Sequence, residues 1–202
     1  LLAARGVTAN LAALEASAGF CDLYGGRAPE ASALSESLGR PWEVEDPGIY
    51  LKKYPACGGT HCALDAALAL REAHAIHAND IESVECALDP QAAKILIHAR
   101  PKTGLEGKFS MEYCLAIALV DGAPGLRHFE EPWVSNAGVQ GLLPRITVRP
   151  DPALAGPDGQ GMPAEVTIHL RGGRAVRQRV DIPSGDPHRP LSPEDRRAKF
   201  LD

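Results

Sequence analysis

The sequence has no long hydrophobic run: within its 202 residues the longest unbroken apolar stretch is Cys114–Val120. A membrane-spanning helix needs about 20 consecutive apolar residues, so none is predicted. Basic residues are not in excess either, since the formal net charge is −5. A general nucleic-acid-binding protein usually presents a basic surface. We therefore expect neither nucleic acid nor a membrane as a partner. The 45% hydrophobic and 23% charged fractions are those of a globular chain with a packed core.

Cysteine is also scarce, and its spacing is irregular. The five cysteines are Cys21, Cys57, Cys62, Cys86 and Cys114. An odd number at irregular spacing predicts neither a disulfide framework nor a zinc site built from paired C-x-x-C motifs. Most of these residues lie in apolar stretches, where free cysteine behaves as a small buried hydrophobe. The simplest interpretation is a protein of the reducing cytoplasm.

The two ends of the sequence predict a piece of a longer protein. Residue 1 is leucine, and the first residues lack the basic and apolar regions of a signal peptide. Near the other end, Ser192-Pro193-Glu194-Asp195 has the pattern of a helix start, with a Ser N-cap, Pro at the first helical position and acids in the first turn. The sequence ends about two turns later, and so short a helix is marginal unless it docks on something.

Apolar periodicity predicts the elements and the fold class. Helical spacing predicts helices over residues 1–24, 61–77, 110–120 and 135–142, with Thr60 and Ser135 as N-caps. Alternation predicts strands over 81–88 and 146–148, and a hairpin over 165–182 with a two-residue Gly172-Gly173 turn. Proline and glycine in residues 27–50 indicate a linker. We expect an α+β fold, in which helices pack on one face of a small, largely antiparallel sheet.

The segment from Lys52 to His61 contains the highest concentration of candidate functional side chains. Two lysines precede a Gly-Gly-Thr helix start, and a helix N-terminus attracts anions through its free N–H groups and its dipole. This arrangement suits a carboxylate or phosphate, although a surface lysine pair before an ordinary helix cap has the same sequence. The spacing also permits a Cys57–His61 nucleophilic pair, or zinc ligation by Cys57, His61 and Cys62.

A second polar loop, residues 102–110, also leads into a helix. Its lysines, Lys102 and Lys108, are candidates for holding an anionic ligand, but the glycine spacing is not that of a Walker loop. A solvated loop is the plain alternative. His74, His77, His98, His128, His169 and His188 are assigned no role.

These motifs together resemble a known family. Lys-x-Tyr-Pro-x-Cys-x-x-Thr-His-x-x-x-Asp-Ala, from Lys52 to Ala66, is similar to the signature of the MmgE/PrpD family. Two further blocks resemble the family in the same order: residues 103–110 with the helix that follows, and Gly185-Asp186-Pro187 through Ser192 to Phe200. The opening residues 1–26 also fit. The resemblance spans nearly the whole chain.

The resemblance implies a fold and a domain organisation. Family members combine a large all-helical domain with a smaller α+β lid domain. We expect residues 1–40 to be the end of the helical domain and a linker, residues 41–190 to be the lid domain, and residues 191–202 to start the return to the helical domain. A homodimer of the longer protein is implied, and the piece alone is expected to be inactive.

The resemblance also implies chemistry on small di- and tricarboxylates, without a metal or another cofactor. We expect a hydro-lyase that dehydrates a 2-methylcitrate-like hydroxy acid. Lys52 occupies the position of a lysine that faces substrate, so Lys52 and His61 are the expected catalytic residues. Lys52, Cys57, Thr60, Lys102 and Lys108 are the expected substrate-binding residues. Most of the family's acid–base residues belong to the helical half.

Three alternatives remain open at this point: an isomerase or epimerase of the same family, a decarboxylase of the same family, and a non-catalytic binding or assembly module. Two positions depart from the decarboxylase pattern. Cys57 stands where the decarboxylase has a histidine, and Lys94-Ile95 stands near its expected tyrosine.

Overall fold

The computed structural model describes residues 3–13, 16–24, 39, 42, 44–155 and 161–201. The chain divides into two compact units, residues 1–49 and 50–202. In the part of the chain that is described, no helix is long and apolar enough to cross a membrane. The linker predicted for residues 27–50 lies largely outside the described residues.

The first unit does not form the helix predicted over residues 1–24. Its described residues contain a 3-10 turn, Ala3–Arg5, and one short α-helix, α1 (Phe20–Tyr24). Gly6 and Ala18 have positive φ angles of 81° and 59°, which no right-handed helix accepts. Leu11, an apolar residue of the predicted helix, is fully exposed. Helical spacing of apolar residues is only a weak signal when it is interrupted in this way, so periodicity alone was a poor guide here.

The second unit is built on a four-stranded sheet in the order β2-β1-β3-β4. The strands are β1 (Ile81–Leu88), β2 (Ile146–Pro150), β3 (Ala164–Leu170) and β4 (Ala175–Val180). β1 pairs in parallel with β2 and antiparallel with β3, and β3 pairs antiparallel with β4. The helices are α3 (His61–Ala73), α4 (Pro90–Ile95), α5 (Gly104–Gly107), α6 (Met111–Val120), α7 (Glu131–Val134), α8 (Ala137–Leu142) and α9 (Pro193–Leu201). The predicted α+β fold, with a mostly antiparallel sheet, is confirmed.

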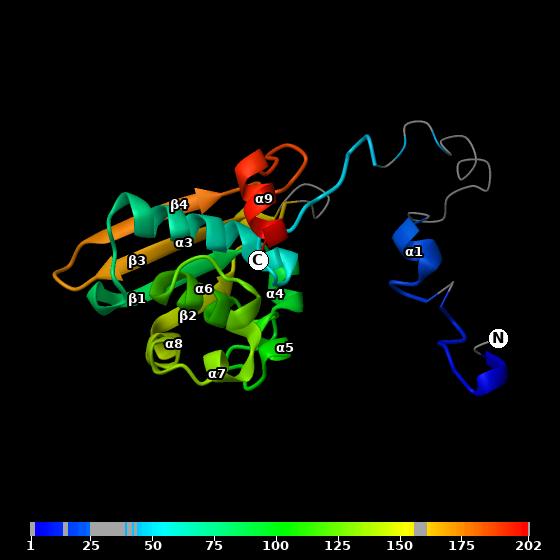
Figure 1. Ribbon diagram of the computed structural model, residues 1–202, viewed down its shortest axis with the longest axis horizontal. Coiled ribbons are helices and arrows are strands. Elements are labelled where there is room, and N and C mark those ends of the chain that lie inside the picture. The colour runs from blue at the N-terminus through cyan, green and yellow to red at the C-terminus, as the bar shows by residue number, and fades with distance from the viewer. Residues whose placement is uncertain are drawn as a thin grey trace. The chain divides into compact units, whose positions relative to one another are not determined.

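Register explains why the helices cover one face of the sheet. Val84 and Cys86 of β1 lie opposite Ile168 and Val166 of β3, and all four side chains are fully buried. Their strand neighbours Glu85 and Thr167 point to the other, more exposed face. In Figure 1, α3 and α6 lie across the buried face. Helix α6 is buried almost all round, as its two apolar sides predicted.

Four local predictions need correction. Helix α3 ends at Ala73 rather than at residue 77, because Ala75 turns left-handed (φ 49°) and sends Ile76 into the core. Thr60 is the N-cap residue of α3, as predicted, but its hydroxyl does not make the expected capping hydrogen bond. Asn136, not Ser135, caps α8, since its side chain accepts hydrogen bonds from two backbone N–H groups.

The hairpin loop has three residues rather than two, because Leu170 N–H donates to the Arg174 carbonyl. The predicted cap of α9 is confirmed, since Ser192 Oγ accepts from Asp195 N–H at 2.9 Å.

Core packing at α6 generates a stability prediction. Leu115 is fully buried, so Leu115→Ala should lower the free energy of unfolding by about 2–5 kcal/mol through lost burial and a cavity. Leu105 is 71% exposed, and Leu105→Ala should change it by less than about 0.5 kcal/mol. Urea denaturation of both variants checks this. Equal losses in the two variants would contradict the packing described here.

Candidate functional site

The segment from Tyr50 to Thr60 leads into α3 and is held by close backbone contacts on two sides. Leu51 N–H donates to the Gly185 carbonyl at 2.9 Å, and Cys57 N–H donates to the Lys108 carbonyl at 2.9 Å. Gly185 has φ 96°, and a Cβ there would lie 1.9 Å from the Leu51 carbonyl oxygen. Only glycine fits this approach. The structure therefore joins three segments that are far apart in sequence: residues 50–60, the 103–110 loop, and the loop that precedes α9.

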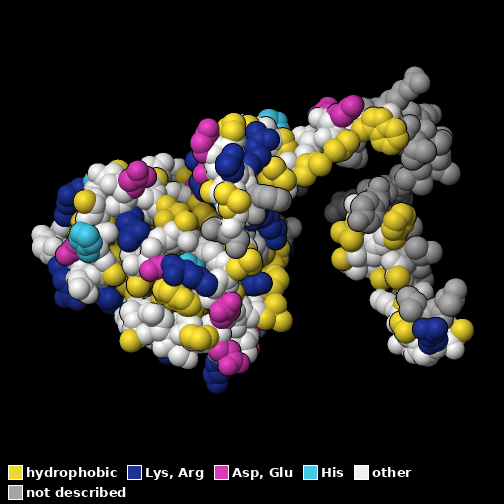
Figure 2. Space-filling view, in the orientation of Figure 1, with side chains coloured by type: hydrophobic (Ala, Val, Ile, Leu, Met, Phe, Trp, Pro, Cys, Tyr) yellow, Lys and Arg dark blue, Asp and Glu magenta, His cyan; other side chains and the backbone are white. Residues whose placement is uncertain are grey.

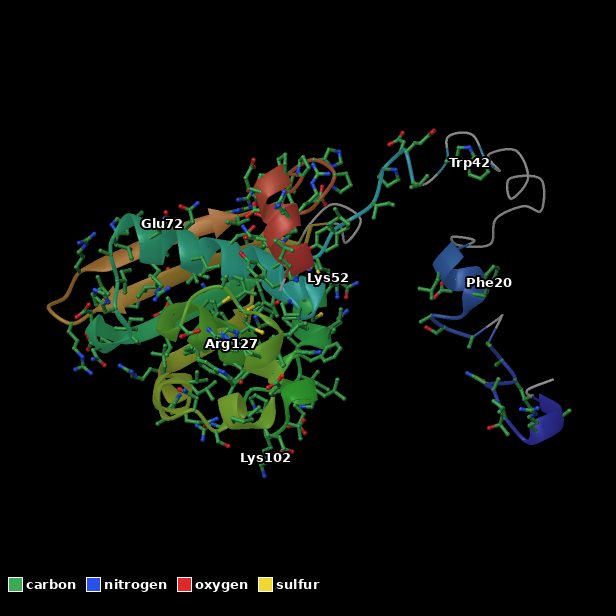
Figure 3. The ribbon with its side chains drawn as sticks, viewed as in Figure 1. Phe20, Trp42, Lys52, Glu72, Lys102 and Arg127 are labelled. Carbon is green, nitrogen blue, oxygen red and sulfur yellow. The ribbon has the colours of Figure 1, made fainter. Side chains whose placement is uncertain are left out.

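Lys52 is exposed, and its Nζ donates to the Ala56 carbonyl at 3.3 Å. Among the described residues it has no carboxylate within ion-pair distance. It lines a depression together with Leu51, Leu191, Arg196 and Lys199. Figure 3 shows Lys52 close to α9, the helix that carries the last two of these residues. An unpaired ammonium at the rim of a depression can bind an anion from solution.

The neighbouring lysine is placed differently. Lys53 Nζ lies 4.0 Å from the Asp195 carboxylate at the start of α9, and 5.9 Å from the centre of the Tyr54 ring. Its charge is therefore partly neutralised by a residue of α9. Of the two adjacent lysines, Lys52 is the one with its charge available to a ligand.

A buried carboxylate fixes this part of the molecule. Asp65, one turn into α3, accepts a hydrogen bond from the Tyr54 hydroxyl at 2.7 Å. Its second oxygen accepts from Ser184 N–H at 2.7 Å and from Arg189 Nη1 at 2.9 Å. Burial and the Asp65 charge raise the pKa of Tyr54, so its hydroxyl stays protonated and keeps donating. The network ties the Lys52 segment, α3 and the 184–189 loop together.

His61 is the first residue of α3, and its side chain is fully buried. Its Nδ1 is hydrogen bonded to the Tyr50 hydroxyl at 2.7 Å, and the Tyr54 ring packs edge-on against it at 5.1 Å between ring centres. Burial lowers the pKa of His61 to about 4, and the nearby Lys52 charge acts in the same direction, although the Ala56 carbonyl opposes both. The ring is therefore neutral at neutral pH.

Among the described residues, neither the Cys57–His61 pair nor zinc ligation by Cys57, His61 and Cys62 gains a supporting contact. The His61 ring bonds to Tyr50, whereas Cys62 Sγ points to the Gly161 carbonyl at 3.1 Å. Within the described ranges, no group of three or more His, Cys, Asp or Glu side chains is placed to hold a metal ion. Cys57 is half-buried, and the cysteines Cys62, Cys86 and Cys114 are buried free thiols. The predicted burial of these three is confirmed; the Cys21 side chain lies outside the described residues.

The structure brings together three of the remaining predicted site residues, Cys57, Thr60 and Lys108, through contacts with the backbone of Cys57 and Lys108. Thr60 is buried, and its hydroxyl donates to the Cys57 carbonyl at 2.8 Å. Lys108 Nζ lies 5.7 Å from the centre of the Phe129 ring, while its backbone contacts Cys57. Lys102 is exposed, and its N–H donates to the Glu106 carboxylate at 2.7 Å. Substrate-binding roles for Cys57, Thr60, Lys102 and Lys108 stay predictions.

Sequence reasoning missed the residues that hold Lys52 in place. Tyr50 stands just before the recognised motif, and Arg189 comes from a loop more than 120 residues away from its partner Asp65. The helical spacing of His61 and Asp65, four residues apart on one face of α3, was the available signal for Asp65. Nothing in the sequence alone indicated that Arg189, Arg196 and Lys199 lie beside Lys52 and its segment.

Comparison with known proteins gives a family match and two named relatives. Residues 54–202 match the MmgE/PrpD C-terminal domain. The chain is 27% identical over 205 residues to a cis-aconitate decarboxylase from Mus musculus, and 25% identical over 203 residues to one from Homo sapiens. Each alignment covers 98% of this chain and 41% of the relative. The chain thus spans about two fifths of the length of the curated relatives it matches.

The buried histidine predicts a specific pH dependence of stability. Because the folded pKa of His61 is about 4 and its ordinary value is 6.5, the unfolded chain binds the extra proton between these values. Stability should therefore fall as the pH drops from about 6.5 to about 4, with His61 contributing at most roughly 3 kcal/mol of that fall. His61→Gln should flatten the dependence in this window.

Denaturation at several pH values between 4 and 7 measures this effect. His77→Gln, at an exposed histidine, is the matched control and should keep the wild-type slope. Identical slopes for wild type and His61→Gln would show that His61 is not held neutral by burial.

Proposed function

Because this chain belongs to the MmgE/PrpD family, we propose that it is part of a lyase that dehydrates a small di- or tricarboxylate, such as a 2-methylcitrate-like hydroxy acid. The observation that carries the proposal is Lys52: an exposed ammonium without an acidic partner among the described residues, held in a fixed segment and lining a depression. The relatives' name, cis-aconitate decarboxylase, independently points to the same substrate class.

Lys52 has a clear chemical task in this reaction. Dehydration removes a proton from the carbon next to a carboxylate and expels the hydroxyl group from the neighbouring carbon. Loss of the proton moves negative charge onto the carboxylate oxygens. An ammonium bound to that carboxylate stabilises the developing charge more than it stabilises the substrate, which lowers the barrier.

His61 contributes through Tyr50 in this proposal. The neutral, buried ring holds the hydroxyl of Tyr50, which is half-buried and stands two residues before Lys52. Burial raises the pKa of Tyr50, so its hydroxyl stays protonated. Since the His61 ring has no exposed surface, we assign it a positioning role rather than direct contact with substrate. The expected homodimer and cytoplasmic location stay predictions.

Decarboxylation is the second candidate, favoured by the names of the two relatives. In that reaction the bond to one carboxylate breaks, CO2 leaves and a proton takes its place on the carbon. Lys52 bound to a neighbouring, retained carboxylate would stabilise the negative charge that the broken bond leaves behind. An epimerase of this family would also begin by removing the proton next to a carboxylate. Product analysis separates the three reactions: alkene formation from a hydroxy acid marks dehydration, CO2 release marks decarboxylation, and inversion without loss of mass marks epimerisation.

Substitution of Lys52 tests the proposal in the full-length protein that contains this chain. The panel of substrates is 2-methylcitrate, citrate, cis-aconitate and iminodisuccinate. Lys52→Ala should lower kcat/KM by at least about 100-fold on the substrate that turns over, because a charge-assisted contact to the reacting carboxylate is lost.

Arg177→Ala is the charge-matched control, since Arg177 is exposed on β4 and pairs with Glu165. It should leave kcat/KM within about twofold of the wild type. An unchanged kcat/KM in Lys52→Ala would refute the anchor role. No turnover of any compound in the panel by the wild-type protein would refute the proposed reaction class and favour a binding or assembly module.

A further inference from the structure

Three cationic side chains surround the depression beside Lys52. Its lining consists of Lys52, Arg196 and Lys199 with the apolar residues Leu51 and Leu191, and its volume is about 420 Å³. This lies within the roughly 300–1,000 Å³ typical of small-ligand sites. In Figure 2, dark blue side chains lie over α9 beside hydrophobic surface. The depression thus combines positive charge with an apolar wall.

The sequence of α9 explains how two of these cations face the same way. Arg196 and Lys199 are three residues apart, which places them on one side of a helix, while Arg197 lies between them in sequence and does not line the depression. The start of α9 is fixed by its Ser192 cap and by the contact between Lys53 and Asp195. The loop before it is fixed by Arg189 on Asp65.

Lys52, Arg196 and Lys199 differ from the neighbouring cations in that they have no acidic partner among the described residues. Lys53 and Arg189 each have an aspartate partner. Lys52, Arg196 and Lys199 have none within ion-pair distance in the described part of the chain. Cations gathered around one depression repel each other, and an anion placed between them removes that repulsion. The apolar wall formed by Leu51 and Leu191 suits the hydrocarbon part of such an anion.

We propose that this depression binds a small anion with at least two carboxylates, and that Arg196 and Lys199 of α9 form the second carboxylate subsite. Lys52 holds the first carboxylate, as in the proposed function on which this inference rests. Arg196 offers a planar guanidinium that can bind a carboxylate through two parallel hydrogen bonds, and Lys199 adds a point charge. The subsite selects polycarboxylates over monocarboxylates.

Isothermal titration calorimetry of the 202-residue chain with citrate, tricarballylate and acetate at constant ionic strength tests the proposal. Citrate and tricarballylate should bind, and acetate should bind at least about tenfold more weakly, since it fills one subsite only. Arg196→Gln and Lys199→Gln should each weaken citrate binding by roughly tenfold, because a charge-assisted contact is lost. Arg196→Lys, which keeps the charge, should lose less than Arg196→Gln.

Arg197→Gln is the matched control, with the same change of charge on the same helix, and should keep citrate affinity within about twofold. Circular dichroism of each variant verifies that the fold is retained. Equal weakening in Arg196→Gln and Arg197→Gln would reduce the effect to net charge and overturn the subsite. Equal affinity for acetate and citrate, or the absence of citrate binding, would overturn it as well.

The experiments distinguish a failure of the carboxylate subsite from a failure of the proposed lyase reaction. Selective citrate binding that depends on Arg196, in a full-length protein without lyase activity, would support the subsite and refute the reaction. Turnover of a tricarboxylate with a KM unchanged by Arg196→Gln would support the reaction and refute the subsite.

Discussion

The arrangement of the candidate site depends on one buried carboxylate. Asp65 is removed from water, and a buried charge is tolerated only when its hydrogen-bonding capacity is met. Its partners are Tyr54, Ser184 N–H and Arg189, and they come from both sides of the site. Each partner therefore fixes the position of a segment: Tyr54 that of Lys52, and Arg189 that of the loop leading to α9. The hydrogen bonds of Asp65 therefore link the Lys52 segment to the loop before α9, and the Leu51–Gly185 and Lys53–Asp195 contacts complete the placement of the cations around the depression.

Burial keeps the neighbouring histidine, His61, uncharged, because it lowers the pKa of the ring. His61 and Asp65 are one helical turn apart, yet the carboxylate is paired and the imidazole is kept neutral. A charged imidazole at this buried position would be repelled by the nearby Lys52 ammonium. Neutral His61 leaves the positive charge of the site to side chains at its rim. A site whose buried histidine is neutral and whose buried carboxylate is already paired can receive an anion without reorganising its own charges.

The sequence predicted the parts of the fold that obey local rules. Strands 81–88 and 146–148, the hairpin and the α6 helix were found because alternation and helical spacing report burial directly. The end of α3 was missed because an alanine, Ala75, occupies the left-handed position that glycine usually marks. The helix predicted at the start failed because the backbone turns left-handed at Gly6 and Ala18, which apolar spacing does not reveal. Lys52 was identified by its motif, whereas Arg189, Arg196 and Lys199 depend on contacts across more than 120 residues, which local patterns do not encode.

Substrate class and reaction type are decided by different parts of such a site. In the proposed function, Lys52 and the cations of α9 bind carboxylate groups, and dehydration, decarboxylation and epimerisation all offer them the same carboxylates. What distinguishes the reactions is the bond that breaks, and that depends on where a base and an acid stand relative to the anchored carbon. The proposed roles of Lys52, Arg196 and Lys199 concern only how a substrate is held. We therefore expect relatives with different chemistries to share a cationic depression. The reaction would change with the acid and base groups placed opposite a constant carboxylate anchor.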